Sequence, residues 1–144
     1  MRKLMTPQSL AGLIGLVFLV LGVCGFVPGA VQQYGELHWW RPGSHAELFD
    51  VFETSVLLNL LHVGFGALGL VAAQADATAR AYLAVGGAAC FGVGIYGLLI
   101  DRLGDANVFP LDRADVWLHV GLGVAMVYAG LAAVLTRLHP AAAA

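Results

Sequence analysis

Long apolar stretches alternate with short polar ones along this chain, and four of the apolar stretches reach the length of a membrane-spanning helix. A helix needs about twenty mostly apolar residues to cross the hydrocarbon core of a bilayer. The stretches cover residues 10–27, 51–73, 81–100 and 116–135. The first ends at Pro28 and Gly29, and the last ends before Arg137. The pattern predicts four transmembrane helices.

Composition supports the same class of protein. Hydrophobic residues make up 60% of the 144 residues and charged residues 11%, whereas about a quarter of a soluble domain is charged. A soluble chain of this size could not bury so much apolar surface, so the excess must face lipid. We therefore predict an all-α fold, a four-helix transmembrane bundle forming a single domain over residues 1–140, with a disordered tail at 141–144. A net charge of -2 gives no clustered basic face for nucleic acid.

Charged residues favour an orientation with both chain ends in the cytoplasm. In that orientation four basic residues lie inside and three outside. This small excess of basic residues on the cytoplasmic side agrees with the positive-inside rule. Eight of the nine acidic residues lie outside, and Asp76 is the exception. We expect a multi-pass, N-in and C-in protein of the bacterial cytoplasmic (inner) membrane.

Glycines recur along the predicted helices at helical spacing. They share faces as Gly12, Gly15 and Gly22, as Gly66 and Gly69, and as Gly123 and Gly130. Small residues let membrane helices approach closely, so these faces predict a compact bundle. The same faces also suit packing against a second copy or against subunits of a larger membrane complex.

The two cysteines lie inside apolar stretches, at different expected depths. By helix rise, Cys24 lies roughly 6 Å and Cys90 roughly 16 Å below the outer ends of their helices. This offset exceeds the reach of a disulfide, so we predict two free packing residues.

Polar side chains inside the membrane are the candidate functional residues, because burying them in lipid is costly. Their number is small, and they concentrate in the outer half: Asn59, His62, Tyr96, Asp115 and His119. By helix rise, His62 lies roughly 13 Å below Glu53, and His119 roughly 6 Å below Asp115. We predict an outward-facing polar pocket between the second, third and fourth helices.

Three interpretations of this group stay open. Its members could satisfy one another's hydrogen bonds across helices. His62 and His119 could ligate a haem or a metal, although an expected depth difference of roughly 7 Å is awkward for opposed axial ligands. The group could instead bind a small ligand or relay protons, with Asp115 orienting His119. No nucleophile–base pair and no cofactor loop is visible in the sequence, so we predict neither an enzyme nor a bound cofactor.

A second polar group precedes the second helix. It consists of His38, His45, Glu47, Asp50 and Glu53. Imidazoles and carboxylates at one membrane face could hold a divalent cation. The alternative is a solvated helix start whose acidic residues stabilise the N-terminus.

Several short segments together resemble a known family. They are Gly25-Phe26-Val27-Pro28-Gly29, Leu48-Phe49-Asp50-Val51-Phe52-Glu53, Asn59-Leu60-Leu61-His62-Val63-Gly64, Tyr96-Gly97-Leu98-Leu99-Ile100-Asp101, the segment Asn107 to Pro110, and Asp115-Val116-Trp117-Leu118-His119. The set resembles domain of unknown function 4383, a family of small four-helix membrane proteins common in actinobacteria. The resemblance implies a membrane location and four helices, and it implies no activity. The loop with His38-Trp39-Trp40 is longer than the family's usual first loop. We expect a small accessory or binding protein.

Overall fold

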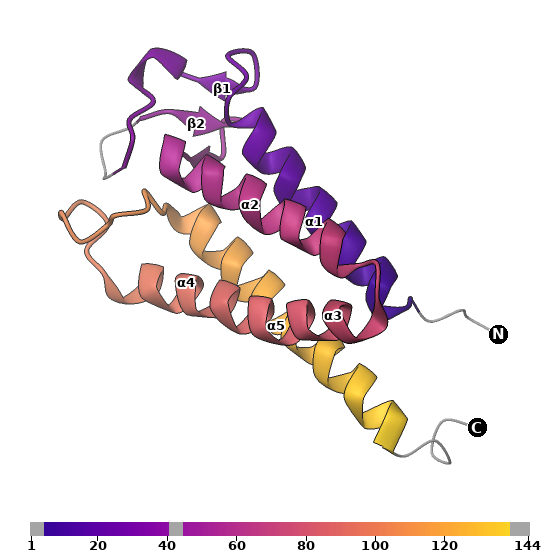
Figure 1. The fold of residues 1–144 in the computed structure, drawn as a ribbon. Helices are drawn as coiled ribbons and strands as arrows, with labels where there is room; N and C mark the ends of the chain where they lie inside the picture. Colours follow the sequence, from indigo (N-terminus) through magenta and orange to yellow (C-terminus); the bar gives the residue numbers. More distant parts are fainter. Residues whose placement is uncertain (1–4, 41–44, 139–144) are drawn as a thin grey trace.

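The computed structural model describes residues 5–40 and 45–138 (Figure 1). The predicted tail at 141–144 lies outside these residues. In the described residues the helices are α1 (Pro7–Cys24), α2 (Val56–Ala72), α3 (Asp76–Ala81), α4 (Gly87–Leu99) and α5 (Arg113–Leu138). A π-helical turn, η2 (Tyr82–Gly86), joins α3 to α4, so that residues 76–99 form one continuous helical rod. The predicted all-α, four-helix fold is confirmed.

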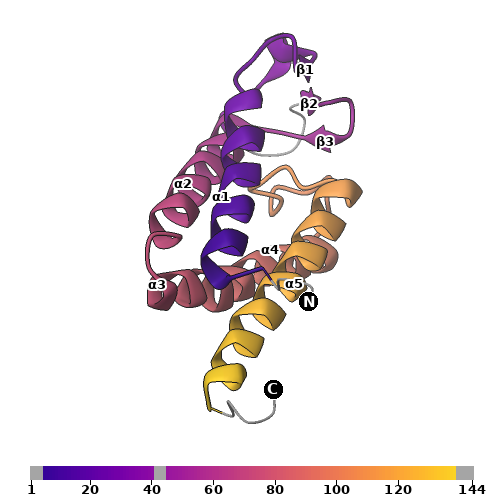
Figure 2. The ribbon, with the colours of Figure 1, turned by 90° about the vertical axis from the view of Figure 1, so that its right-hand side faces the viewer.

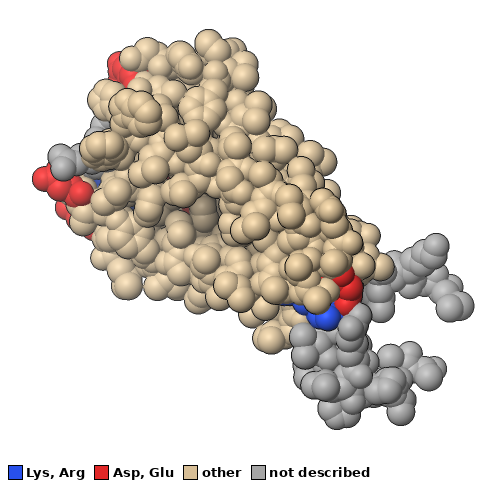
Figure 3. Space-filling view, viewed as in Figure 1, with Lys and Arg blue, Asp and Glu red and all other residues tan. Residues whose placement is uncertain are grey.

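Several helices are long and apolar enough to span a membrane. Within the described residues, three qualify: Pro7–Cys24, Asp76–Leu99 and Arg113–Ala132. The apolar helix α2 has 17 residues, or roughly 25 Å at the usual helix rise, which is at the lower end of the spanning range. Figure 3 shows the charged side chains of this face at two ends of the molecule, with an uncharged belt between them. The belt is the surface that contacts lipid.

The helices associate as sequential antiparallel pairs. α1 packs along α2, and α4 packs along α5, whereas contacts between the pairs are far fewer. Figures 1 and 2 show the pairs meeting near α3 and separating toward the opposite end. That opposite end carries the segment between α1 and α2, which forms a small sheet, and the loop 100–112, which joins α4 to α5. The start of α1 lies at the same end of the molecule as the described end of α5.

Glycines produce the close approach within each pair. A Cβ atom on Gly66 would lie 2.4 Å from the backbone nitrogen of Leu19, and one on Gly22 would lie 2.6 Å from that of Val63. In the other pair, a Cβ on Gly123 would lie 2.4 Å from the Phe91 nitrogen. These distances are shorter than any normal contact, so only glycine permits the observed spacing. The glycine faces therefore pack helices of this chain against each other, as predicted.

A small antiparallel sheet precedes α2, which the sequence pattern did not predict. The described residues form strands β1 (Val31–Gln32), β2 (Glu47–Leu48) and β3 (Phe52–Glu53), in the order β1-β2-β3. A short 3₁₀ helix, η1 (Tyr34–Glu36), follows β1. The second helix therefore begins at Val56 rather than at the predicted residue 51. Ser55 is its N-cap, and the Ser55 side chain accepts a hydrogen bond from the Leu58 N–H.

The start of α5 is fixed by a reciprocal pair of aspartates. The Asp115 N–H donates to Oδ1 of Asp112 at 2.8 Å, and the Asp112 N–H donates to Oδ2 of Asp115 at 3.3 Å. This arrangement is a capping box built from two acidic residues. The helix begins at Arg113, three residues before the predicted start.

Candidate functional site

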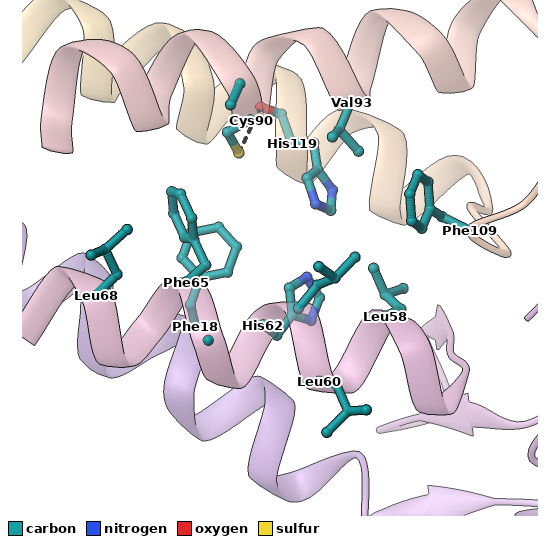
Figure 4. A pocket seen from close by; sticks show the side chains of 13 residues that line it. Phe18, Leu58, Leu60, His62, Phe65, Leu68, Cys90, Val93, Phe109 and His119 are labelled. Carbon is teal, nitrogen blue, oxygen red and sulfur yellow. Dashed lines mark hydrogen bonds between the residues drawn. The ribbon is translucent and has the colours of Figure 1, made fainter. Parts of the chain in front are cut away.

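A cavity of about 370 Å³ lies between the α1–α2 pair and the α4–α5 pair. Its walls are apolar apart from two imidazoles (Figure 4). The lining residues include Phe18 of α1, Leu58, Leu61, His62, Phe65 and Leu68 of α2, Ala89, Cys90 and Val93 of α4, Phe109 of the loop before α5, and His119 of α5. The cavity is thus formed by residues from both pairs and from most of the length of the chain.

The mouth of the cavity opens on the uncharged belt. Leu60, Leu61 and Leu68 line it and are 50%, 48% and 58% exposed. A hollow between the upper and lower helix pairs is visible in Figure 3, away from the charged ends. The cavity therefore opens on an apolar part of the surface.

His62 is the most unusual side chain of the site. It is 8% exposed, and neither of its ring nitrogens has a hydrogen-bond partner among the described residues. Its ring packs against Phe18, with centroids 5.4 Å apart. Buried polar atoms are nearly always hydrogen-bonded in native proteins. A buried imidazole with two unpartnered nitrogens at a cavity wall is therefore a candidate ligand-binding group.

His119 faces His62 across the site. The ring centroids are 5.8 Å apart and the ring planes differ by 22°, and Figure 4 shows both rings directed into the space between α2 and α5. Nδ1 of His119 lies 2.8 Å from the carbonyl oxygen of Asp115. A carbonyl oxygen only accepts, so Nδ1 carries the proton, and in the neutral ring Nε2 is left as an acceptor.

The depth argument from the sequence is wrong. It placed His62 roughly 7 Å deeper than His119, whereas the two rings are 5.8 Å apart between centroids. The error came from the assumed starts of both helices, Glu53 for the second and Asp115 for the fourth. Because α2 begins at Val56 and α5 at Arg113, His62 (62 − 56 = 6) and His119 (119 − 113 = 6) each follow the first residue of their helix by six positions. Their depths are therefore similar.

Comparison with known proteins identifies the family. Residues 8–132 match the family model described as Domain of unknown function (DUF4383). The chain belongs to the DUF4383 family. No curated protein and no solved structure matches the chain. The family confirms the resemblance inferred from the sequence, and it brings no activity to the site of this DUF4383 protein.

Asn59, placed in the predicted pocket, lies in this DUF4383 structure at the junction of α2 with the end of α1. Its side chain is fully buried. Its Nδ2 donates to the Gly25 carbonyl oxygen at 2.8 Å, and its Oδ1 accepts from the Thr54 hydroxyl at 2.6 Å. Its polar atoms are thus engaged by neighbours other than His62, Asp115 or His119. Asn59 joins α1 to α2 and does not line the large cavity.

Tyr96 and Asp115 also lie apart from the large cavity. The Tyr96 hydroxyl donates to the Ala106 carbonyl oxygen and accepts from the Val108 N–H at 3.3 Å, which attaches the loop 100–112 to α4. Asp115 belongs to the capping box of α5. The Asp115 group that orients His119 is the backbone carbonyl and not the predicted carboxylate. Asp115 and His62 share only a small void of about 10 Å³.

The outer group of His38, His45, Glu47, Asp50 and Glu53 is distributed over the sheet and its connections. Within residues 5–40 and 45–138, no three His, Cys, Asp or Glu side chains gather closely enough to hold a metal ion. Glu47 and Glu53 lie opposite each other on adjacent strands β2 and β3. The structure therefore does not assemble the cation site considered from the sequence.

Sequence reasoning missed the apolar walls of the DUF4383 cavity. Phe18, Phe65 and Phe109 look like ordinary membrane residues in the sequence, and nothing in their spacing marks a cavity. Cys90 was predicted to be a packing residue. It is free and buried, and it also lines the cavity. Its thiol donates a hydrogen bond to the His119 carbonyl oxygen at 3.5 Å. The sequence signal for this site was His62 itself, an ionisable side chain within an apolar stretch, and it was among the predicted pocket residues.

Proposed function

We propose that this DUF4383 protein is a membrane binding protein that takes a lipophilic small molecule from the bilayer into the cavity between the α1–α2 and α4–α5 pairs. The observation that carries the proposal is the combination of apolar walls with His62, a buried imidazole lacking a hydrogen-bond partner among the described residues. Small-molecule sites are concave and mostly apolar, with a few polar groups that fix orientation. The cavity has this composition, and the two imidazoles are its polar groups.

The position of the mouth supports a ligand that arrives through lipid. Its exposed leucines belong to the uncharged belt, so a water-soluble ligand would have to cross the bilayer interface to reach them. A lipophilic ligand is already concentrated in the acyl region. The proposed role is binding or presentation and not catalysis.

A pair of adjacent alanines on α4 provides the test. Both are exposed, but Ala89 lines the cavity whereas Ala88 does not. The protein is purified in a mild detergent and analysed by native mass spectrometry, followed by solvent extraction. We expect a co-purifying lipophile with the wild type and with Ala88→Trp, and its loss with Ala89→Trp. Equal lipophile content in all three proteins, or none in the wild type, would refute the proposal.

Haem or metal ligation by His62 and His119 is a second candidate, favoured by one observation. The two imidazoles face each other with centroids 5.8 Å apart, and the Nδ1 of His119 bonds a backbone carbonyl, as metal-ligating histidines commonly do. Elemental analysis and an absorption spectrum of the purified protein decide. A Soret band or one metal ion per chain, lost in His119→Phe, would favour ligation over binding of an organic lipophile.

The proposal also includes the orientation of the chain in the membrane. The chain is N-in and C-in in a bacterial inner membrane, which agrees with the start of α1 and the described end of α5 lying at one end (Figure 1). A periplasm-active alkaline phosphatase fused after Ala106 should be active, and the same enzyme fused at the C-terminus should be inactive.

An alternative role as a subunit of a larger complex would use glycine faces, but Gly66 and Gly123 are occupied within the chain. Co-purification in mild detergent tests for such a partner.

A further inference from the structure

The two imidazoles of the cavity offer a defined set of hydrogen-bonding atoms. His119 presents its Nε2 as an acceptor, because its Nδ1 proton is held by the Asp115 carbonyl oxygen at 2.8 Å. His62 has no partner for either nitrogen among the described residues, so its neutral ring brings one N–H donor and one acceptor. The site therefore presents at least one fixed acceptor and one available donor.

From this set we infer that the ligand carries a neutral hydroxyl group, as an alcohol or a phenol, on an apolar body. This inference rests on the proposed function, since it concerns the same cavity. One hydroxyl oxygen can donate its hydrogen to Nε2 of His119 while accepting the N–H of His62. The ring centroids are 5.8 Å apart and the ring planes differ by 22°, so a hydroxyl that serves both imidazoles would lie at the ring edges, where the nitrogens are.

Other common polar groups match the two imidazoles less well. A ketone or an ether accepts the His62 N–H but leaves the His119 nitrogen facing another acceptor. A carboxylate has the same mismatch and also brings a charge into apolar walls, which is costly. An ammonium group has donors only, and it is charged as well. Among these groups, only the hydroxyl uses both imidazoles without a charge.

The shape of the cavity places the apolar body of the ligand. From His62 the lining continues along α2 through Phe65 to Leu68, six residues further on, or roughly 9 Å by helix rise. Figure 4 shows Phe65, Phe18 and Leu68 on one side of the imidazoles. A hydroxyl held at the imidazoles would thus direct an alkyl chain along α2, away from the end that carries the sheet.

The experiment compares two probes with the same apolar body, 4-hexylphenol and its methyl ether, 4-hexylanisole. The full chain is reconstituted in phosphatidylcholine vesicles, and binding is measured by equilibrium dialysis, corrected with protein-free vesicles for partitioning into lipid. We expect the phenol to bind at least about tenfold more tightly than the ether, because the ether leaves the His119 acceptor unpaired. His119→Phe should reduce this preference to less than about threefold, mainly by weakening phenol binding.

The outcomes separate this inference from the proposed function. If both probes bind equally well and Ala89→Trp abolishes both, the cavity binds lipophiles but the hydroxyl inference is wrong. If neither probe binds the wild type above the vesicle background, both ideas fail. His119→Gln retains an acceptor and should keep part of the phenol preference. If His119→Phe does not fold, as judged by thermal unfolding, the His119→Gln and His62→Phe variants carry the comparison, and an unchanged preference in both overturns the inference.

Discussion

Replacing His62 with leucine is expected to stabilise the ligand-free protein. His62 is 8% exposed and has two ring nitrogens without a partner among the described residues. A buried polar group left unsatisfied costs about 1–3 kcal/mol relative to a satisfied or apolar one. Leucine is apolar and similar in size, and hydrophobic substitutions of similar volume are tolerated in cores. We therefore expect His62→Leu to raise the free energy of unfolding by about 1–3 kcal/mol.

Asn59→Leu is the matched control, since Asn59 lies one turn earlier on the same helix and is also buried. Its polar atoms are hydrogen-bonded to the Gly25 carbonyl and the Thr54 hydroxyl at 2.8 and 2.6 Å. A typical intramolecular hydrogen bond contributes about 0.5–1.5 kcal/mol to stability. Losing both should lower the free energy of unfolding by about 1–3 kcal/mol. The same substitution on one helix should thus have opposite signs at the two positions.

The assay is reversible unfolding by sodium dodecyl sulfate in mixed micelles, followed by circular dichroism. Bound ligand must first be removed, because a ligand of the native state raises apparent stability. A clear loss of stability in His62→Leu, comparable to that of Asn59→Leu, would refute the reasoning. It would mean that His62 has a partner in the ligand-free protein, such as a water molecule in the void of about 10 Å³ shared with Asp115.

Three other predictions use the same protein. Gly66→Ala should lower the free energy of unfolding by about 1–3 kcal/mol, since the added Cβ would lie 2.4 Å from the backbone of α1. Gly64→Ala is the control: its Cβ would meet nothing within 4 Å, so the substitution should be neutral or stabilising. Equal effects of the two substitutions on stability would contradict the packing role of Gly66. Asp112→Ala should cost about 1 kcal/mol by removing the cap of α5, and Asp112→Ser should restore most of it; indistinguishable unfolding curves would argue against the capping box. Cys90 lines the cavity and should be protected from N-ethylmaleimide by 4-hexylphenol, whereas Cys24 should react at an unchanged rate. Mass spectrometry of the modified protein measures both rates, and equal protection would place the probe elsewhere.

The helices could be predicted from the sequence because lipid imposes them. Twenty apolar residues in a row have few structural solutions in a bilayer, and glycine spacing then indicates which faces approach. Gly66 and Gly123 were identified in this way, and both contact the backbone of a neighbouring helix. The family could also be identified, because its segments are spread over most of the chain.

The site was less predictable, since it depends on where helices start. The sheet that delays α2 to Val56 has strands of two residues, too short for an alternating pattern. Phe49 and Asp50 turn the chain there with φ of 55° and 60°, without the Asn-Gly or Asp-Gly pair that marks such turns. The resulting shift brought His62 level with His119. The acceptor of Asn59 is a backbone carbonyl at the end of α1, which side-chain patterns do not reveal.

The sequential pairing of the helices has a consequence for biogenesis. α1 and α2 are neighbours in the chain and complete most of their packing with each other, so this hairpin can assemble before the second half of the protein has left the ribosome. Membrane helices insert first and associate afterwards, and the second hairpin can likewise close through its own glycines. The cavity belongs to neither hairpin alone. It forms in the last step, when the two hairpins dock, and a lipophile present in the bilayer at that moment would be enclosed during assembly.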